Sequence, residues 1–336
     1  MKKWFFVLLA GLLLLSCTGS LNVDNNSVTV TLSDKSKVRI QPVNGQIFRI
    51  SAVPEGERFS ARPSLMRVAG ETPPVPFECV EEEQRVIVKT ESLQASVDKI
   101  TGEMIFMDLE GHVILQENKG GGKSFEPVEV DGDKGYTIRQ VFESPENEAF
   151  YGLGQHQSDE FNYKGKNETL YQYNTKVSVP FILSNKHYGL LWDNNSLSRF
   201  GNPEDYRQLD VLDLMDADGQ EGALTAVYAS SDGKTEYLRR REPVIDYTDL
   251  DKVKNFPEGI PFHNARITWE GTVGAKESGI HHFLLYYAGY TRVFFNGEEV
   301  VGERWRTAWN PNSYKFQIDM EAGVAYPLRI DWVPDG

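Results

Sequence analysis

Short runs that alternate apolar and polar residues recur along this chain, and almost no segment has the spacing of a helix. Val28, Val30 and Leu32 alternate with threonines, and the run from Leu93 to Val97 alternates in the same way. A period of two residues is typical of β-strands with one buried face. Many short strands joined by tight turns pack as sandwiches. The sequence therefore predicts an all-β protein.

A second set of strand signals begins at Ala223, after a polar span over residues 194–222. Asn296-Gly297, between two apolar runs, is the strongest short-range signal for a hairpin. Residues 280–288 are apolar on both faces, which predicts a buried central strand. One more alternating run predicts a strand with a single buried face: Tyr326, Leu328, Ile330 and Trp332.

Residues 1–20 have the features of a bacterial lipoprotein signal peptide. Two lysines precede an apolar run that is too short for a permanent membrane helix. The sequence Leu14-Leu15-Ser16-Cys17 then resembles a lipobox, so we expect Cys17 to be lipidated and to anchor the exported protein to a membrane. Neither Thr18 nor Gly19, which come directly after Cys17, is an aspartate, and this favours the outer membrane and leaves its periplasmic and surface faces open. The alternative is an ordinary secretion signal with an incidental cysteine.

Composition excludes several classes of function. The other cysteine is Cys79, so neither a disulfide framework nor a cysteine-rich zinc site is expected. The net charge of −14 makes the chain a poor match for phosphate backbones, so we expect no nucleic-acid partner. No motif indicates a cofactor.

The stretch from Phe150 to Asn195 carries the most specific pattern. Gly152 and Gly154 interrupt a strand-like run, which indicates a bulge or a close approach of two backbone segments. Two further strand-like runs follow, and a polar cluster that begins at Asp193 closes the last of them.

This layout resembles the amino-terminal, galactose-mutarotase-like β-sandwich of family 31 glycoside hydrolases, over residues 22–222. The matching segments stand in the expected order: Gly152-Leu153-Gly154-Gln155-His156, Asn174-Thr175, and Pro180-Phe181 through Trp192-Asp193-Asn194. The resemblance implies a retaining α-glycosidase whose chemistry takes place in a separate (β/α)₈ barrel. We therefore expect this portion to be non-catalytic, to contact an oligosaccharide substrate and to pack against the barrel of the same polypeptide.

Residues 223–336 resemble a PA14 module through three segments: GALTAVYA, RITWEGTV and GIHHFLLYYAGYTRVFFNGEEVV. The resemblance implies a second β-sandwich. Because PA14 modules normally close with one or two more strands, we expect this module to be incomplete. A missing strand would leave an unpaired edge and an uncovered apolar face, so Tyr326, Leu328, Ile330 and Trp332 would lose part of their cover.

The pair of modules is similar to the arrangement in α-xylosidases of family 31, which act on xyloglucan oligosaccharides. The spelling Gly154-Gln155-His156-Gln157 also favours that branch over α-glucosidases of the same family. A rival from another class is a non-catalytic glycan-binding surface lipoprotein that uses the same two sandwiches.

No residue of the sequence is a good candidate for catalysis or for binding a metal. Asp193 ends a strand-like run, where an aspartate usually bonds to its own backbone. His281 and His282 are neighbours on an expected strand and point to opposite faces, so they cannot chelate one ion. Some PA14 modules hold calcium with a pair of aspartates, but residues 288–290 occupy that place without a carboxylate.

Five residues are candidates for contacting sugar. The resemblance implies contacts from a loop that contains Asn174, Thr175 and Lys176, although many relatives carry aspartate in place of this lysine, and a plain strand connection is the alternative. Trp305 and Trp309 lie in a polar segment that we expect to be a loop. Exposed indoles can stack on the apolar face of a sugar; the alternative is that they cap the core of the second sandwich.

Overall fold

A computed structural model describes residues 20–66, 74–156, 160–172, 174, 176–201, 206–247 and 256–334. Strands dominate these residues, with two short 3-10 helices at Leu209–Val211 and Phe262–Asn264, so the all-β prediction is confirmed. None of the described helices is long and apolar enough to cross a membrane. The lipidation expected at Cys17 falls outside the described residues and stays a prediction.

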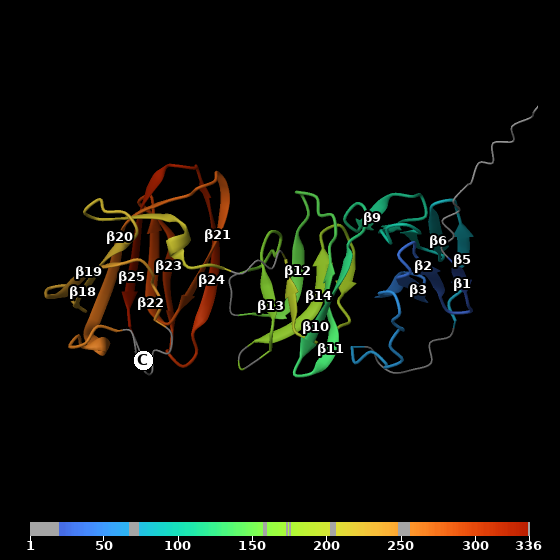
Figure 1. Cartoon of the computed structure of the whole chain (residues 1–336), viewed down its shortest axis with the longest axis horizontal. Coiled ribbons are helices and arrows are strands. Elements are labelled where there is room, and N and C mark those ends of the chain that lie inside the picture. The colour runs from blue at the N-terminus through green and yellow to red at the C-terminus, as the bar shows by residue number, and fades with distance from the viewer. Residues whose placement is uncertain are drawn as a thin grey trace, which may run out of the picture. The chain divides into compact units, whose positions relative to one another are not determined.

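The chain divides into two compact units (Figure 1). The first combines residues up to Phe150 with Ile182–Asn195, and the second combines Tyr151–Phe181 with the residues from Ser196 onward. Apart from β13, the strands that precede Ser196 are β1 (Leu21–Val23), β2 (Val28–Thr31), β3 (Lys37–Asn44), β4 (Ile47–Val53), β5 (Glu78–Glu81), β6 (Arg85–Lys89), β7 (Gln94–Asp98), β8 (Met104–Met107), β9 (Val113–Gln116), β10 (Lys123–Val130), β11 (Asp133–Gln140), β12 (Phe150–Gln155), β14 (Val177–Ser184) and β15 (Gly189–Leu191).

Two antiparallel sheets enclose the core of the first unit. One has the order β1-β2-β3-β4, and the other is the meander β5-β6-β7-β8-β9. The alternating residues Val28 and Val30 are completely buried, as predicted, and belong to one core with Ile40 of the neighbouring strand and with Val86 and Val97 of the other sheet. Strands β10 and β11 form a separate hairpin, and β12, β14 and β15 form a three-stranded sheet.

Besides residues 151–155 of β12 and 177–181 of β14, the second unit contains β13 (Glu168–Leu170) and the strands that follow Ser196. These are β16 (Ser198–Phe200), β17 (Asp213–Asp216), β18 (Leu224–Ser230), β19 (Glu236–Glu242), β20 (Ala265–Gly274), β21 (Gly279–Tyr287), β22 (Gly289–Phe295), β23 (Glu298–Arg306), β24 (Asn312–Met320) and β25 (Ala325–Val333).

A seven-stranded sheet dominates this unit, in the order β19-β18-β20-β25-β22-β23, with β17 also paired to β20. Strands β21 and β24 form a second, two-stranded sheet. The core between them centres on Tyr228 and Trp269, which are at most 1% exposed. Asn296 and Gly297 both have positive φ, at 50° and 83°, and turn β22 into β23 as the sequence predicts. The fold is therefore two β-sandwiches.

The expectation that the apolar side chains of residues 326–332 would lose part of their cover is wrong. Strand β25 lies in the interior of the large sheet, because it pairs with β20 on one side and with β22 on the other. Leu328 and Trp332 are each only 7% exposed. The partner strands β20 and β22 lie roughly 60 and 40 residues earlier in the chain. Pairing between such distant segments leaves no local signal in the sequence.

The expectation of a buried central strand at residues 280–288 is also wrong. Strand β21 pairs with β24 in a sheet of two strands. One of its faces packs on the core through Phe283 and Leu285, while Ile280 and Tyr286 on the other face are 64% and 62% exposed. Apolar residues on both faces are therefore no proof of burial on both faces.

Candidate functional site

A left-handed stretch of backbone shapes the Gly-Leu-Gly segment of β12. The φ angles of Gly152, Leu153 and Gly154 are 122°, 63° and 97°. A Cβ atom at Gly154 would lie 2.1 Å from the carbonyl oxygen of Val177 on β14. The predicted close approach is confirmed, and only glycine fits there because the backbone is left-handed and the neighbouring strand leaves no space.

This turn places His156 in a buried ionic cluster. The imidazole Nε2 lies 2.8 Å from the carbonyl oxygen of Leu153, and the side chain is only 1% exposed. Its Nδ1 atom lies 3.7 Å from one carboxylate oxygen of Glu168, and the ammonium group of Lys315 lies 3.7 Å from the other. The carboxylate of Glu168 therefore lies between the imidazole of His156 and the ammonium group of Lys315.

Lys315 brings the second sandwich into this cluster, because it lies on β24 while Glu168 lies on β13. Burial lowers the pKa of Lys315, and the attraction of Glu168 opposes that shift. On the same strand, Gln317 donates a weak hydrogen bond of 3.4 Å to the carbonyl oxygen of Gly165. The segment that precedes the expected sugar-contacting loop is therefore held by a strand of the PA14-like sandwich.

The expected sugar-contacting loop is only partly described. Asn174 is exposed in a turn, with a positive φ of 36°, and Lys176 is half-buried just before β14. Thr175 lies outside the described residues. An exposed amide and an ammonium group at this turn can donate hydrogen bonds to the hydroxyl groups of a sugar.

The two candidate tryptophans lie near the end of β23 in the second unit. Trp305 belongs to this strand and is 43% exposed, while Trp309 follows in a turn and is 71% exposed. The expectation of a loop was wrong for Trp305. Tyr290 of β22 is its cross-strand neighbour, and the two ring centroids are 6.2 Å apart with an interplanar angle of 38°.

Sequence reasoning missed Tyr290. The Asn296-Gly297 turn fixes the hairpin, but the β22–β23 ladder shifts register at Thr291 and Val293. Counting outward from the turn therefore gives the wrong partner for Trp305, because each irregularity moves the pairing along the strand.

Asp193 has a structural role. One carboxylate oxygen accepts a hydrogen bond of 3.0 Å from Arg49, and the other accepts one of 2.7 Å from the hydroxyl of Ser64. Both partners are distant in sequence, so the prediction that Asp193 bonds to its own backbone was wrong. Both carboxylate oxygens nevertheless accept hydrogen bonds within the fold.

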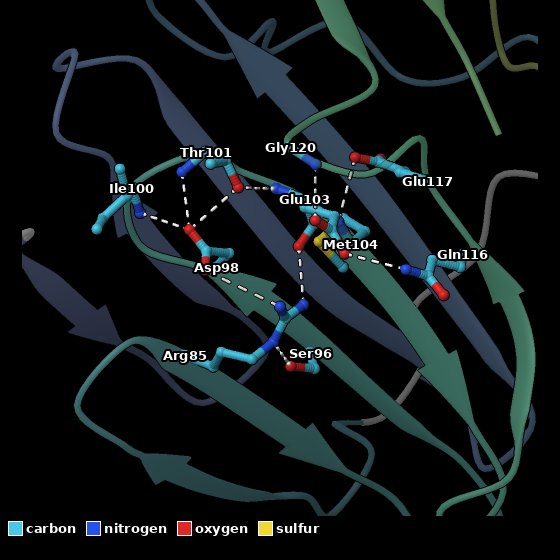
Figure 2. Close-up of polar contacts among 10 residues, drawn as sticks. All are labelled: Arg85, Ser96, Asp98, Ile100, Thr101, Glu103, Met104, Gln116, Glu117 and Gly120. Atoms are coloured by element: carbon cyan, nitrogen blue, oxygen red, sulfur yellow. Dashed lines mark hydrogen bonds and ion pairs between the residues drawn. The ribbon is translucent and has the colours of Figure 1, made fainter. Parts of the chain in front are cut away.

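Two buried glutamates of the first unit, Glu103 and Glu117, accept hydrogen bonds from the backbone of neighbouring segments. Glu103 accepts hydrogen bonds from the backbone N–H of Gly120 at 2.9 Å and from the amide of Gln116 at 3.2 Å (Figure 2). Glu117 accepts one from the backbone N–H of Met104 at 3.1 Å and pairs with the ammonium group of Lys123. These carboxylates therefore close turns of the meander.

The paired histidines have separate partners. The Nε2 atom of His281 lies 3.0 Å from the carbonyl oxygen of Glu277, and the Nδ1 atom of His282 lies 3.2 Å from the amide of Gln317. Another cluster, at the turn between β8 and β9, brings Asp108, Glu110 and His112 within 4.8 Å, but it is mostly exposed and His112 already pairs with Asp108.

The fold and these sites define a chain of two β-sandwich modules with sugar-contacting candidates in both segments. Residues 37–200 match the glycosyl hydrolase 31 N-terminal galactose mutarotase-like domain, and residues 219–336 match the PA14 domain. The chain therefore contains an amino-terminal, galactose mutarotase-like domain of the glycosyl hydrolase 31 type, followed by a PA14 domain.

Relatives of known name agree with this assignment. The chain is 39% identical to a solved family 31 α-xylosidase from Xanthomonas citri, with a TM-score of 0.82 over 93% of this chain and 34% of the other. It is 38% identical over 117 residues to an α-xylosidase of Saccharolobus solfataricus, which is 32% of this chain and 15% of the relative. It is 24% identical over 184 residues to an uncharacterized family 31 glucosidase of Pseudescherichia vulneris, which is 49% of this chain and 34% of the relative. The chain thus spans about a third or less of each relative.

Proposed function

We propose that this chain is the non-catalytic amino-terminal portion of an exported family 31 retaining α-glycosidase, and that the enzyme is an α-xylosidase acting on xyloglucan oligosaccharides. The main support is the likeness to the Xanthomonas citri α-xylosidase, which covers both sandwiches at 39% identity. In this proposal a catalytic barrel belongs to the same polypeptide, and the chain contributes packing against the barrel and contacts to the glycan.

The proposed glycan contacts are those of Asn174, Thr175 and Lys176 in one loop and of Trp305 and Trp309 near the end of β23. Asn174 is exposed at a turn, and both indoles present large exposed surfaces. The buried cluster of His156, Glu168 and Lys315 holds the chain just before the loop. A loop anchored in this way loses less entropy on binding a ligand than a free one does.

An α-glucosidase of the same family is the second candidate. It is supported by the match to a family 31 glucosidase, which extends over 49% of this chain but at only 24% identity. The higher identity to two α-xylosidases favours xylose over glucose.

The proposal predicts that the purified chain hydrolyses neither aryl α-xyloside nor aryl α-glucoside. Retaining hydrolysis needs two carboxyl groups that flank the scissile bond, and the family's barrel supplies them in this proposal. We expect that a chimera in which this chain replaces the matching third of the Xanthomonas citri α-xylosidase hydrolyses the xyloside in preference to the glucoside. Release of the aryl group measures both results. Turnover by the repurified chain alone, or a folded chimera without xylosidase activity, would contradict the proposal.

We also propose that Cys17 carries a lipid anchor. Its support is the apolar run and the lipobox-like sequence that ends at this residue. Cys17→Ser is expected to move the protein from the membrane fraction to the soluble periplasm, because lipid is the only anchor in the proposal. Mass spectrometry of the wild-type amino terminus checks the modification directly, and an unmodified terminus cleaved elsewhere would refute it.

A further inference from the structure

The solvent-facing side of the large sheet in the second unit carries an ordered set of rings and charges. In an antiparallel sheet, cross-strand partners share a face. The register places Tyr290 opposite Trp305, and it places Asp331 between Thr268 and Arg292. These residues come from the four adjacent strands β20, β25, β22 and β23, so the face is continuous.

The aromatic part of this face is a two-ring surface. Tyr290 and Trp305 are 41% and 43% exposed, so nearly half of each side chain remains in contact with water. Their rings are tilted by only 38° at 6.2 Å, and they form one patch about two rings long. A patch of this kind binds the apolar C–H face of a sugar ring, and it is too shallow to enclose one.

The polar part is built on one buried carboxylate. Asp331 is 7% exposed and accepts hydrogen bonds of 2.9 Å from the hydroxyl of Thr268 and 2.6 Å from Arg329. Arg266 lies 3.3 Å from the same side chain. Burial acts against the charge of Asp331, but the bonds from Arg329 and Thr268 prevail and lower its pKa below the usual value. The two arginines are therefore fixed in place.

The charges of this face are matched with each other. Arg292 pairs with Glu303 at 3.0 Å and approaches Glu299 at 3.8 Å, as Arg266 and Arg329 pair with Asp331. An acidic ligand would have to compete with these carboxylates for the arginines. A neutral ligand with many hydroxyl groups can instead share the outer N–H groups and carboxylate oxygens as donors and acceptors.

We propose that this face, comprising Tyr290, Trp305, Arg292, Arg329 and Glu303, is a binding platform for an extended, neutral, β-linked oligosaccharide. The inference rests on the proposed function. It describes the glycan chemically, and it adds Tyr290, Arg292, Arg329 and Glu303 to the glycan contact proposed for Trp305. A flat β-linked chain fits because the face is an open sheet, and its alternating ring faces present C–H groups to the aromatic pair.

The test measures binding of cellohexaose to the purified full chain by isothermal titration calorimetry. Tyr290→Ala and Trp305→Ala should each weaken binding about tenfold or more, because each variant removes one of the two rings that the sugar would contact. Trp305→Phe, which keeps a ring, should weaken it less. Tyr286→Ala is the matched control, because this tyrosine is 62% exposed on β21 of the other sheet and should leave the affinity unchanged. Circular dichroism melting checks that all variants fold.

The outcomes separate this inference from the proposed function. Wild-type affinity in both ring variants would overturn the platform, and if Asn174→Ala weakened binding in the same experiment the proposed function would stand. Preference for oligogalacturonate over cellohexaose would overturn the assignment to neutral glycans. If the wild type binds no cellohexaose while the chimeric enzyme remains active on aryl xyloside, the platform fails and the proposed function survives.

Discussion

Glu242→Ala is expected to lower the free energy of unfolding of the second sandwich by about 3–5 kcal/mol, because it removes a buried anion that several groups share. The carboxylate is 5% exposed and accepts hydrogen bonds of 2.7 Å from the indole of Trp269 and 2.6 Å from Arg240. It also accepts hydrogen bonds from the hydroxyl groups of Tyr228 and Tyr247. The variant would leave buried donors without acceptors.

Electrostatics at Glu242 support this size of effect. Burial, and then the hydrogen bond to Glu242, raise the pKa of the Tyr228 hydroxyl above its usual value. The hydroxyl therefore remains a donor to the carboxylate across the ordinary pH range. Around it, Tyr247 packs against Trp269 and Trp332 at ring distances of 6.1 Å and 5.3 Å, so the network also orients an aromatic cluster.

Urea unfolding followed by circular dichroism measures the effect of Glu242→Ala. Glu236→Ala is the matched control, since it removes a glutamate of the same strand whose side chain is 49% exposed and pairs with Arg239 at the surface. The control is expected to change the free energy of unfolding by about 0.5 kcal/mol or less. Equal losses in the two variants would show that the buried network does not stabilise the sandwich.

Gly154→Ala is expected to cost about 3 kcal/mol or more and to disturb the pairing of β12 with β14. The new Cβ would lie 2.1 Å from the carbonyl oxygen of Val177 and 2.9 Å from the amide nitrogen of Val179. Both atoms belong to the backbone of a paired strand and cannot move aside as a flexible side chain does. The φ of +97° adds conformational strain.

A second glycine separates the two causes. Gly222 has a similar φ of +91°, but an added Cβ there would meet no atom within 4 Å. Gly222→Ala is therefore expected to cost only the strain of a left-handed residue, about 1–2 kcal/mol. Thermal and urea unfolding of both variants give the comparison. If Gly154→Ala is no worse than Gly222→Ala, the close approach of β12 to β14 does not constrain this position.

Much of the fold could be predicted from local pattern. Alternation identified the buried positions Val28 and Val30, because every second side chain of a strand faces the same side. The Asn296-Gly297 turn was predicted because both residues tolerate positive φ. The two glycines of β12 indicated a close backbone approach, which the structure confirms at Gly154.

The remainder depended on partners far apart in the chain. The pattern of residues 326–332 gave the buried face of β25 but could not show that β20 and β22 cover both its edges. The residues of β21 looked buried on both faces, yet the strand ended in a two-stranded sheet with one face in water. Strand order is decided by which distant segments meet, and hydrophobic alternation does not encode that.

The candidate site was likewise predicted only as far as local sequence allows. By itself, the sequence determined two all-β modules, their family and the residue types able to contact sugar, because strand period, turn chemistry and motif order are local properties. Three contacts were decided only by the tertiary structure. They are the ring contact between Tyr290 and Trp305 and the ion pairs Arg49–Asp193 and Lys315–Glu168. Each of these pairs depends on sheet register or on contact between separate segments, so it exists only when the chain has folded.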